Sequence, residues 1–342
     1  MTSSSRGKKS VGVGLAAALL TIAVLAASGC GSSSGLASSG GGKINLVGYS
    51  TPQSVYEEGL EPGFEKTSAG SGISFSNSFG ASGDQSRAVA AGQPAGVVHF
   101  SIATDMTRLV EEGQVSPDWE RQPYNGIVEE SVVVLVVRKG NPKGIHSFDD
   151  LLSRDVSIVT PNPFSSGAAR WNIMAVYGSQ IEKGRSPAQA LDAVKTVLEK
   201  TQVQPASGRD ALTAFTQGQG DVLLSYENEA IKAEDAGEDV EYVIPDDTVL
   251  IETPIAVTKE AGPEAQRFLD YLWSEAGQKT WAESGYRPVN PKLVDPEQFP
   301  TPKGLFTIAR FGGWEKVKQR FFEEGTGSIT KIEEELGVST AG

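Results

Sequence analysis

The chain has 342 residues, 30 of them basic and 43 acidic, and its formal net charge at neutral pH is −13. This length is enough for about two domains. The acidic balance argues against a nucleic-acid partner, because nucleic acids are bound mainly through clustered lysine and arginine. One cysteine and two histidines exclude an intramolecular disulfide and a CxxC redox motif, and they argue against a multi-histidine metal site. We therefore expect neither a metal nor a cofactor.

Residues 1–29 resemble the signal peptide of a bacterial lipoprotein. Three basic residues precede an apolar run from Val11 to Ala27, and small residues then lead directly to Cys30. This lipobox-like ending implies that Cys30 is acylated, so we expect an extracytoplasmic lipoprotein anchored to the cell membrane. A single transmembrane anchor is the alternative, but the apolar run is short for a full span and lacks a flanking charge on its far side. Residues 30–42 are mainly glycine and serine, which predicts a flexible tether.

Strand and helix patterns alternate through the first part of the folded region. Runs rich in apolar and β-branched residues predict three strands, at 44–49, 74–79 and 97–103. A helical pattern follows each of these strands. The first helix carries an apolar residue at every fourth position from Tyr56 to Phe64, which predicts one buried face. Such alternation is typical of an α/β fold with a mostly parallel sheet.

The second part of the chain contains two candidate crossovers between lobes. Ser131–Arg138 is the strongest strand pattern, which indicates burial on both faces or a passage between domains. Residues 251–258 form another extended apolar run, which we interpret as the return crossover. We therefore expect one lobe of residues 43–130 plus 255–342 and another of residues 131–254, and we leave open whether the C-terminal helices bridge them. The other predicted strands are 156–160 and 221–226, and the other predicted helices are 148–152, 168–177, 187–200, 207–217, 227–230, 266–273, 276–283 and 314–323.

The segment Pro161–Trp171 joins a predicted strand to a predicted helix and has the composition of an anion site. Its prolines end the strand, and Ser165, Ser166 and Gly167 begin the helix. The first backbone N–H groups of a helix have no partner within it, and the helix dipole makes this end slightly positive. Such an end can bind an anion without a charged side chain. An ordinary capped helix is the simpler interpretation.

Three more predicted helix starts share this composition of small and hydroxyl-bearing residues: Tyr49–Thr51, Ala81–Gly83 and Ser207–Gly208. In open α/β sheets, ligands bind beyond the carboxyl ends of strands and near helix N-termini. Each hydrogen bond to a charged group contributes roughly 1.5–3 kcal/mol, so a handful of donors suffices for micromolar affinity, which needs about 8 kcal/mol. Tyr226, at the end of a predicted strand, either adds a phenol donor or packs in the core.

Signals of an enzyme are weak, and we expect no catalytic activity. Ser82 and Ser166 lack the surroundings of a GxSxG nucleophile motif. His99 lies inside a strand pattern and His146 in a polar turn, and nothing in the sequence ties either histidine to a serine.

Seven short motifs resemble one known family: Asn141–Gly144, Thr160–Pro163, Ser166–Gly167, Ala169–Asn172, Gly220–Leu224, Glu227–Ala230 and Arg310–Trp314. From Ile44 to Ile332 the chain is similar to the sulfate/thiosulfate-binding component of bacterial ABC importers, and most similar to the actinobacterial lipoprotein members. The resemblance implies a two-lobed α/β periplasmic-binding-protein fold of type II, with the ligand in the cleft between the lobes. It also implies a monomeric receptor that delivers sulfate, with thiosulfate as a second candidate, to membrane permease subunits.

The resemblance further implies that main-chain N–H groups, a serine hydroxyl and an aromatic N–H hold a dehydrated sulfate, with no neutralising cation. Carried over by motif, the binding residues are Ser50, Ser82, Gly83, Ser166, Gly167, Ala168, Gly208 and Tyr226. Three positions depart from the family pattern, because Ser50 replaces an acidic residue, Ala168 a glycine and Tyr226 a tryptophan. Ala168 keeps its backbone N–H, whereas Tyr226 presents a phenol at a different reach.

The alternatives are another oxyanion, namely thiosulfate, phosphate or molybdate, and a serine hydrolase. A site made of donors alone suits sulfate, which carries no proton at neutral pH, whereas phosphate keeps an O–H that needs an acceptor. Asp84 is the one carboxylate placed close to a predicted anion site. We therefore expect Asp84 to point away from the anion and to pair with a basic side chain such as Arg87.

Overall fold

The computed structural model describes residues 42–293 and 296–340. The predicted signal peptide, the predicted tether up to residue 41 and Cys30, the predicted acylation site, lie outside the described residues. In the described part of the chain, no helix is both long and apolar enough to cross a membrane.

The strands of the described residues form one continuous sheet. They are β1 (Lys43–Tyr49), β2 (Ser74–Gly80), β3 (Val97–His99), β4 (Ile127–Arg138), β5 (Ile158–Val159), β6 (Thr201–Val203), β7 (Val222–Tyr226), β8 (Val240–Val243), β9 (Leu250–Val257) and β10 (Arg287–Pro288). The order along the sheet is β2-β1-β3-β9-β4-β7-β5-β6, and β8 and β10 also pair with β4. Pairs within β2-β1-β3 and within β7-β5-β6 are parallel, whereas β4 and β9 pair antiparallel with all their neighbours.

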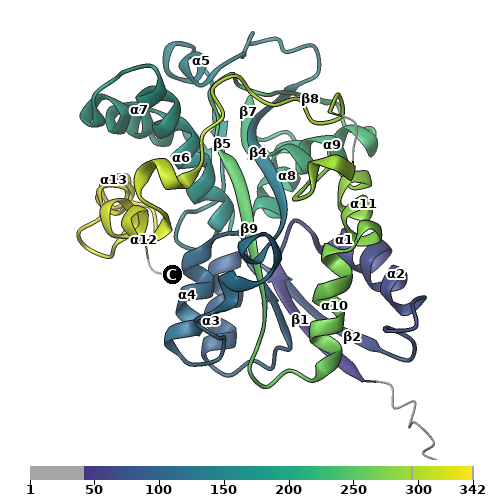
Figure 1. Cartoon of the computed structure of the whole chain (residues 1–342). Helices are drawn as coiled ribbons and strands as arrows, with labels where there is room; N and C mark the ends of the chain where they lie inside the picture. Colours follow the sequence, from purple (N-terminus) through teal and green to yellow (C-terminus); the bar gives the residue numbers. More distant parts are fainter. Residues whose placement is uncertain (1–41, 294–295, 341–342) are drawn as a thin grey trace, which may run out of the picture. The chain divides into compact units, whose positions relative to one another are not determined.

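Helices connect the parallel strands and lie on either side of the sheet (Figure 1). The α-helices are α1 (Gln53–Val55), α2 (Glu61–Glu65), α3 (Ser82–Ala90), α4 (Ala103–Glu111), α5 (Phe148–Ser153), α6 (Gly167–Glu182), α7 (Pro187–Glu199), α8 (Gly208–Thr216), α9 (Glu227–Asp235), α10 (Pro263–Trp273), α11 (Glu275–Glu283), α12 (Trp314–Val317) and α13 (Ser328–Glu335). Parallel strands require such crossover connections. The predicted alternation of strands and helices is therefore confirmed.

β4 and β9 join the two parallel parts of the sheet and run side by side through its middle (Figure 1). β4 pairs with β9 through its first half, Ile127–Val132, and with β7 through Val133–Val137. β9 pairs with β4 first and then with β3 through Ile255–Val257. We call the part built on β1, β2 and β3 lobe 1, and the part built on β5, β6 and β7 lobe 2. The residue boundaries of the lobes stay a prediction.

The packing of β4 explains why its sequence is so apolar. Alternate side chains enter two different hydrophobic clusters, one that includes α6 residues (Val133, Leu135, Val137) and one that includes α8 residues (Val132, Val134, Val136). All six are buried. Burying a side chain of this size stabilises a fold by about 1.5–3 kcal/mol. This strand therefore anchors both faces of the sheet, as the predicted two-sided burial requires.

Several elements are shorter than predicted or were missed. The predicted strands 97–103 and 156–160 shorten to β3 and β5, because the residues that follow each strand turn toward α4 and α6. β6, β8 and β10 contain two to four residues, too few for an alternating pattern to be recognised in the sequence, and α13 was not predicted. The predicted apolar face from Tyr56 to Phe64 is fully buried, although a π-helical turn (Tyr56–Leu60) separates α1 from α2.

We expect Leu135→Ala to lower the free energy of unfolding by about 2–5 kcal/mol, because the substitution leaves a cavity at a fully buried position of β4. Leu336→Ala is the matched control, because Leu336 is 39% exposed and its truncation should have a much smaller effect. Urea unfolding followed by circular dichroism measures both. Equal unfolding midpoints for the two variants would contradict this account of the core.

Candidate functional site

The four predicted helix starts lie together where the two lobes meet. The N–H of Gly83, in the first turn of α3, donates to the carbonyl of Ser165 just before α6 over 2.9 Å. A Cβ atom added to Gly208, the first residue of α8, would lie 3.5 Å from the Cβ of Ala168 and 3.3 Å from Cγ2 of Thr51. The starts of α3, α6 and α8 and the segment that follows β1 therefore lie close together.

Backbone donors are the main chemical feature of this junction. The first-turn N–H groups of α3, α6 and α8 have no partner within their own helices, and the helix dipoles add a positive potential there. Of the eight predicted binding residues, all but the half-buried Ser50 are buried. Ser166 caps α6 without a side-chain hydrogen bond, so its hydroxyl is available to a ligand. The N–H of Gly83 is already used by Ser165.

Ser82 differs from the expectation of a free hydroxyl donor. Its Oγ donates to Oδ2 of Asp105 over 2.6 Å and accepts the backbone N–H of Ser101 over 3.0 Å. A hydroxyl has one proton, and here the carboxylate of Asp105 takes it. The backbone N–H of Ser82, in the first turn of α3, is the donor that this residue can still offer.

Tyr226 has one of the two roles that its sequence position left open, core packing, and its role as a donor to a ligand stays a prediction. It is 1% exposed at the end of β7, so it packs in the core. Its hydroxyl also lies 2.7 Å from Oγ of Ser101, which follows β3 in the other lobe. Burial raises the pKa of Tyr226 well above its ordinary value, so the phenol keeps its proton.

The arginines around the junction have carboxylate or carbonyl partners. The predicted pair of Asp84 with Arg87 is confirmed, at 2.5 Å, and Arg108 pairs with Asp105 at 3.1 Å. Arg209, next to Gly208, lies 2.7 Å from Glu229. Among these described pairs, each positive charge is therefore balanced by a carboxylate. Arg170 on α6 differs, because it donates to the carbonyl of Pro163 over 2.7 Å and no ion pair among the described residues holds it. Helix dipoles and hydrogen-bond donors add to its positive charge in favouring an anion.

A buried polar network lies next to the junction, on the crossover strands. Oε1 of Glu129 on β4 accepts the hydroxyls of Tyr49 and Thr253, both over 2.5 Å. Nε2 of His99 lies 3.1 Å from Oγ1 of Thr253, and its Nδ1 lies 2.9 Å from the hydroxyl oxygen of Tyr56. Burial lowers the pKa of His99 to about 3, so the ring is neutral, and burial raises the pKa of Glu129 to about 8.

Sequence reasoning missed the roles of Ser101 and Asp105 at the junction. Ser101 contacts Ser82 and Tyr226, and its carbonyl accepts the indole N–H of Trp171 over 2.8 Å. Asp105 binds the hydroxyl of Ser82, and the carbonyl of Thr51 accepts Arg209 over 2.7 Å. The only available signal for Ser101 was its position just after a predicted strand, where site residues gather in α/β sheets.

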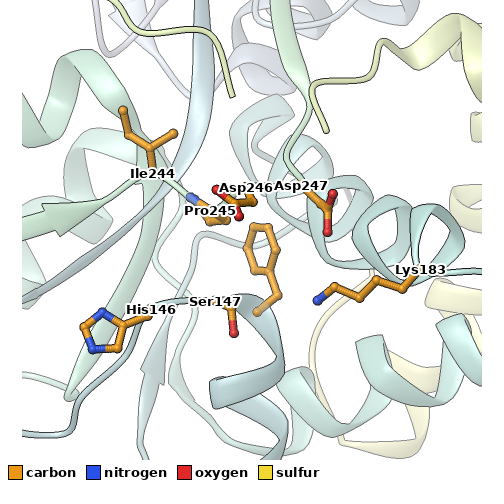
Figure 2. A pocket seen from close by; sticks show the side chains of 8 residues that line it. His146, Ser147, Lys183, Ile244, Pro245, Asp246 and Asp247 are labelled. Atoms are coloured by element: carbon orange, nitrogen blue, oxygen red, sulfur yellow. The ribbon is translucent and has the colours of Figure 1, made fainter. Parts of the chain in front are cut away.

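A separate cavity of about 260 Å³ lies away from the predicted site, lined by His146, Ser147, Phe148, Lys183, Ile244, Pro245, Asp246 and Asp247 (Figure 2). Lys183 is paired with Asp149 at 2.8 Å and Asp246 with Lys303 at 3.1 Å. Asp246 and Asp247 in the lining of this cavity disfavour an anion, and no predicted binding residue lines the cavity. Within the described residues, no cluster of three or more His, Cys, Asp or Glu side chains could hold a metal.

Comparisons with known proteins agree on one kind of molecule. Residues 44–287 match the family described as bacterial extracellular solute-binding protein. The sulfate-binding protein of Synechococcus elongatus is 38% identical over 334 residues, covering 93% of this chain and 95% of that protein. The thiosulfate-binding protein of Pseudomonas aeruginosa is 34% identical, covering 82% and 89%. The solved structure of the sulfate-binding protein SubI from Mycobacterium tuberculosis H37Rv has a TM-score of 0.78 and 42% identity, covering 81% of this chain and 98% of that one.

We expect Glu129→Gln to flatten the dependence of stability on pH. Glu129 has a pKa of about 8 in the folded protein against 4.5 ordinarily, so its contribution is fully present below pH 4.5 and is lost as the pH rises through 8. The full loss is several kcal/mol, since one pKa unit corresponds to about 1.4 kcal/mol. Urea unfolding at pH 5, 6.5 and 8 measures this effect. If the difference in stability between wild type and variant stays constant over that range, Glu129 does not titrate as described.

Proposed function

The chain belongs to the family of bacterial extracellular solute-binding proteins, and on this premise we propose that it is a sulfate receptor serving an ABC importer. Family membership confirms the predicted resemblance, and the likeness to a solved family structure confirms the two-lobed α/β fold of type II. The relatives are solute-binding receptors rather than enzymes, as expected. The family is extracellular, so this chain also lies outside the cytoplasm.

The observation that carries the proposal is the convergence of buried helix starts that offer backbone N–H donors. The proposed contacts are the backbone N–H groups of Ser50, Ser82, Gly167, Ala168 and Gly208 and the hydroxyl of Ser166, whereas Gly83 and Tyr226 line the site. At roughly 1.5–3 kcal/mol for each hydrogen bond to a charged group, a subset of these donors accounts for micromolar or tighter binding.

Sulfate fits this donor set better than phosphate does. Phosphate at neutral pH carries a proton that needs an acceptor. One buried carboxylate of the junction, Asp105, already accepts Ser82 through Oδ2 and Arg108 through Oδ1. Asp84 is bound to Arg87. Thiosulfate has no proton either, and one relative is a thiosulfate-binding protein, so thiosulfate is the second candidate.

Hydrogen bonds across the junction hold the two lobes together. Gly83 in lobe 1 donates to Ser165 in lobe 2, Trp171 in lobe 2 donates to Ser101 in lobe 1, and Lys232 on α9 reaches Oγ of Ser54. We propose lobe boundaries of 43–130 plus 255–342 and 131–254, and that sulfate adds its own contacts to both lobes. A monomeric receptor with a lipid on Cys30 then presents the anion to the permease subunits.

We expect Ala168→Pro to weaken sulfate binding by about tenfold or more, because proline removes one N–H donor to a buried dianion. The fold should survive, since Ala168 is the second residue of α6 and proline is tolerated in the first helical turn. Ala168→Gly keeps the N–H and is the matched control. Isothermal titration calorimetry with sulfate, thiosulfate, phosphate and molybdate measures affinity and preference. A folded Ala168→Pro protein with undiminished sulfate affinity would remove this turn from the site.

We expect Cys30→Ser to release the protein from the membrane fraction, because the only thiol that can be acylated is lost. Cell fractionation and immunoblotting measure the distribution. Sulfate affinity of the released protein should equal that of the wild type, since the site lies within residues 42–340. Retention of Cys30→Ser in the membrane fraction would contradict lipid anchoring.

A further inference from the structure

The hydroxyl of Ser82 is not free to serve as a ligand donor in lobe 1. Its one proton lies on the 2.6 Å bond to Asp105, and one of its lone pairs accepts the N–H of Ser101. Asp105 is itself held by Arg108 at 3.1 Å, and both Ser82 and Asp105 are 2% exposed. Rotating the Ser82 hydroxyl toward an anion would leave a buried carboxylate with one bond fewer, which costs free energy.

One of the two hydroxyl protons of Ser101 and Tyr226 is not used in the hydrogen bond between them. Their hydroxyl oxygens are 2.7 Å apart, and one hydrogen bond between two hydroxyls uses only one of their two protons. Both residues are 1% exposed, so the second proton lies in a buried place where a donor needs an acceptor. The carbonyl of Ser101 is fixed by Trp171 and its N–H by Ser82, so the backbone that carries this hydroxyl is held on both sides.

The hydroxyl of Ser101 also lies close to the start of α6. A Cβ atom added to Gly167 would lie 2.6 Å from Oγ of Ser101 and 2.7 Å from its Cβ. Oγ of Ser101 thus lies directly against the backbone of the first residue of α6, beside the free N–H groups of that helix. Glycine at position 167 is what permits this approach.

We propose that Ser101, oriented by the hydroxyl of Tyr226, is an anion-binding residue that supplies the side-chain donor of lobe 1, and that Ser82 contributes only its backbone N–H. The inference rests on the proposed function, since it concerns the same site. In this arrangement Tyr226 donates to Oγ of Ser101, and Ser101 donates to an anion oxygen held at the start of α6. The two hydroxyls act in series, so each strengthens the other's bond.

The test is calorimetric titration of the full chain with sulfate for Ser101→Ala, Tyr226→Phe, the double variant and Ser82→Ala. Ser101→Ala should weaken binding about tenfold or more, because the donor is lost. Tyr226→Phe should weaken binding less than Ser101→Ala, because Ser101 keeps its own proton. The double variant should bind like Ser101→Ala alone, since Tyr226 acts through Ser101. Ser82→Ala keeps the backbone N–H, so it should weaken binding less than Ser101→Ala does, and it should lower the thermal midpoint without sulfate because the bond to Asp105 is lost.

The outcomes separate this inference from the proposed function. If the wild type does not bind sulfate, the proposed function fails. If the wild type binds sulfate and Ser101→Ala binds it equally well, Ser101 is not a ligand. A larger loss in Tyr226→Phe than in Ser101→Ala would make Tyr226 the direct donor and overturn the order of the two hydroxyls. A tenfold loss in Ser82→Ala with an unchanged midpoint would return the donor role to Ser82. Thermal unfolding of each variant without sulfate shows whether it is folded.

Discussion

A buried divalent anion held by uncharged donors requires that those donors point at it before it arrives. Water solvates such an ion strongly, so a protein can replace water only with groups that need no reordering. The starts of α3, α6 and α8 meet this requirement, because their N–H groups are fixed by the helices and have no partner within them. Lysine or arginine side chains would have to be ordered for the same purpose. Here Arg87, Arg108 and Arg209 are instead already bound to carboxylates.

The position of these helix starts depends in turn on β4 and β9. The donors come from both lobes, so an error in the placement of one lobe would move half of them. β4 fills a hydrophobic cluster on each of its faces, and β9 pairs with it over five residue positions. The network of Tyr49, Glu129 and Thr253 ties β1 to both crossover strands within a few residues of Ser50. Hydrophobic packing and polar contacts thus both hold β4 and β9 in place, and these two strands fix the position of one lobe relative to the other.

The sequence predicted the features that depend on neighbouring residues. It did not predict the contacts between residues that are far apart in the chain. The helix start at Ser166–Ala168 could be predicted, because small residues, a preceding proline pair and a following apolar helix lie within a dozen positions. The strand Ser131–Arg138 could be predicted because two-sided burial leaves a continuous apolar run. The partner of Ser82 could not, because Asp105 lies 23 positions away on another helix. Likewise, the bond between Ser101 and Tyr226 spans 125 positions and exists only once the lobes meet.

The pairing of arginines with carboxylates near the site also has a kinetic consequence. A sulfate ion approaching a chain with 13 more acidic than basic groups meets a repulsive field, and the charges of Arg87, Arg108 and Arg209 near the site are already offset by carboxylates. Salt screens such a field beyond about 8 Å at physiological ionic strength, so the capture rate rises with ionic strength rather than falling. Tight binding in such a protein must come from slow release. The dwell time of the anion, and not the frequency of its encounters, is then what the donor geometry controls.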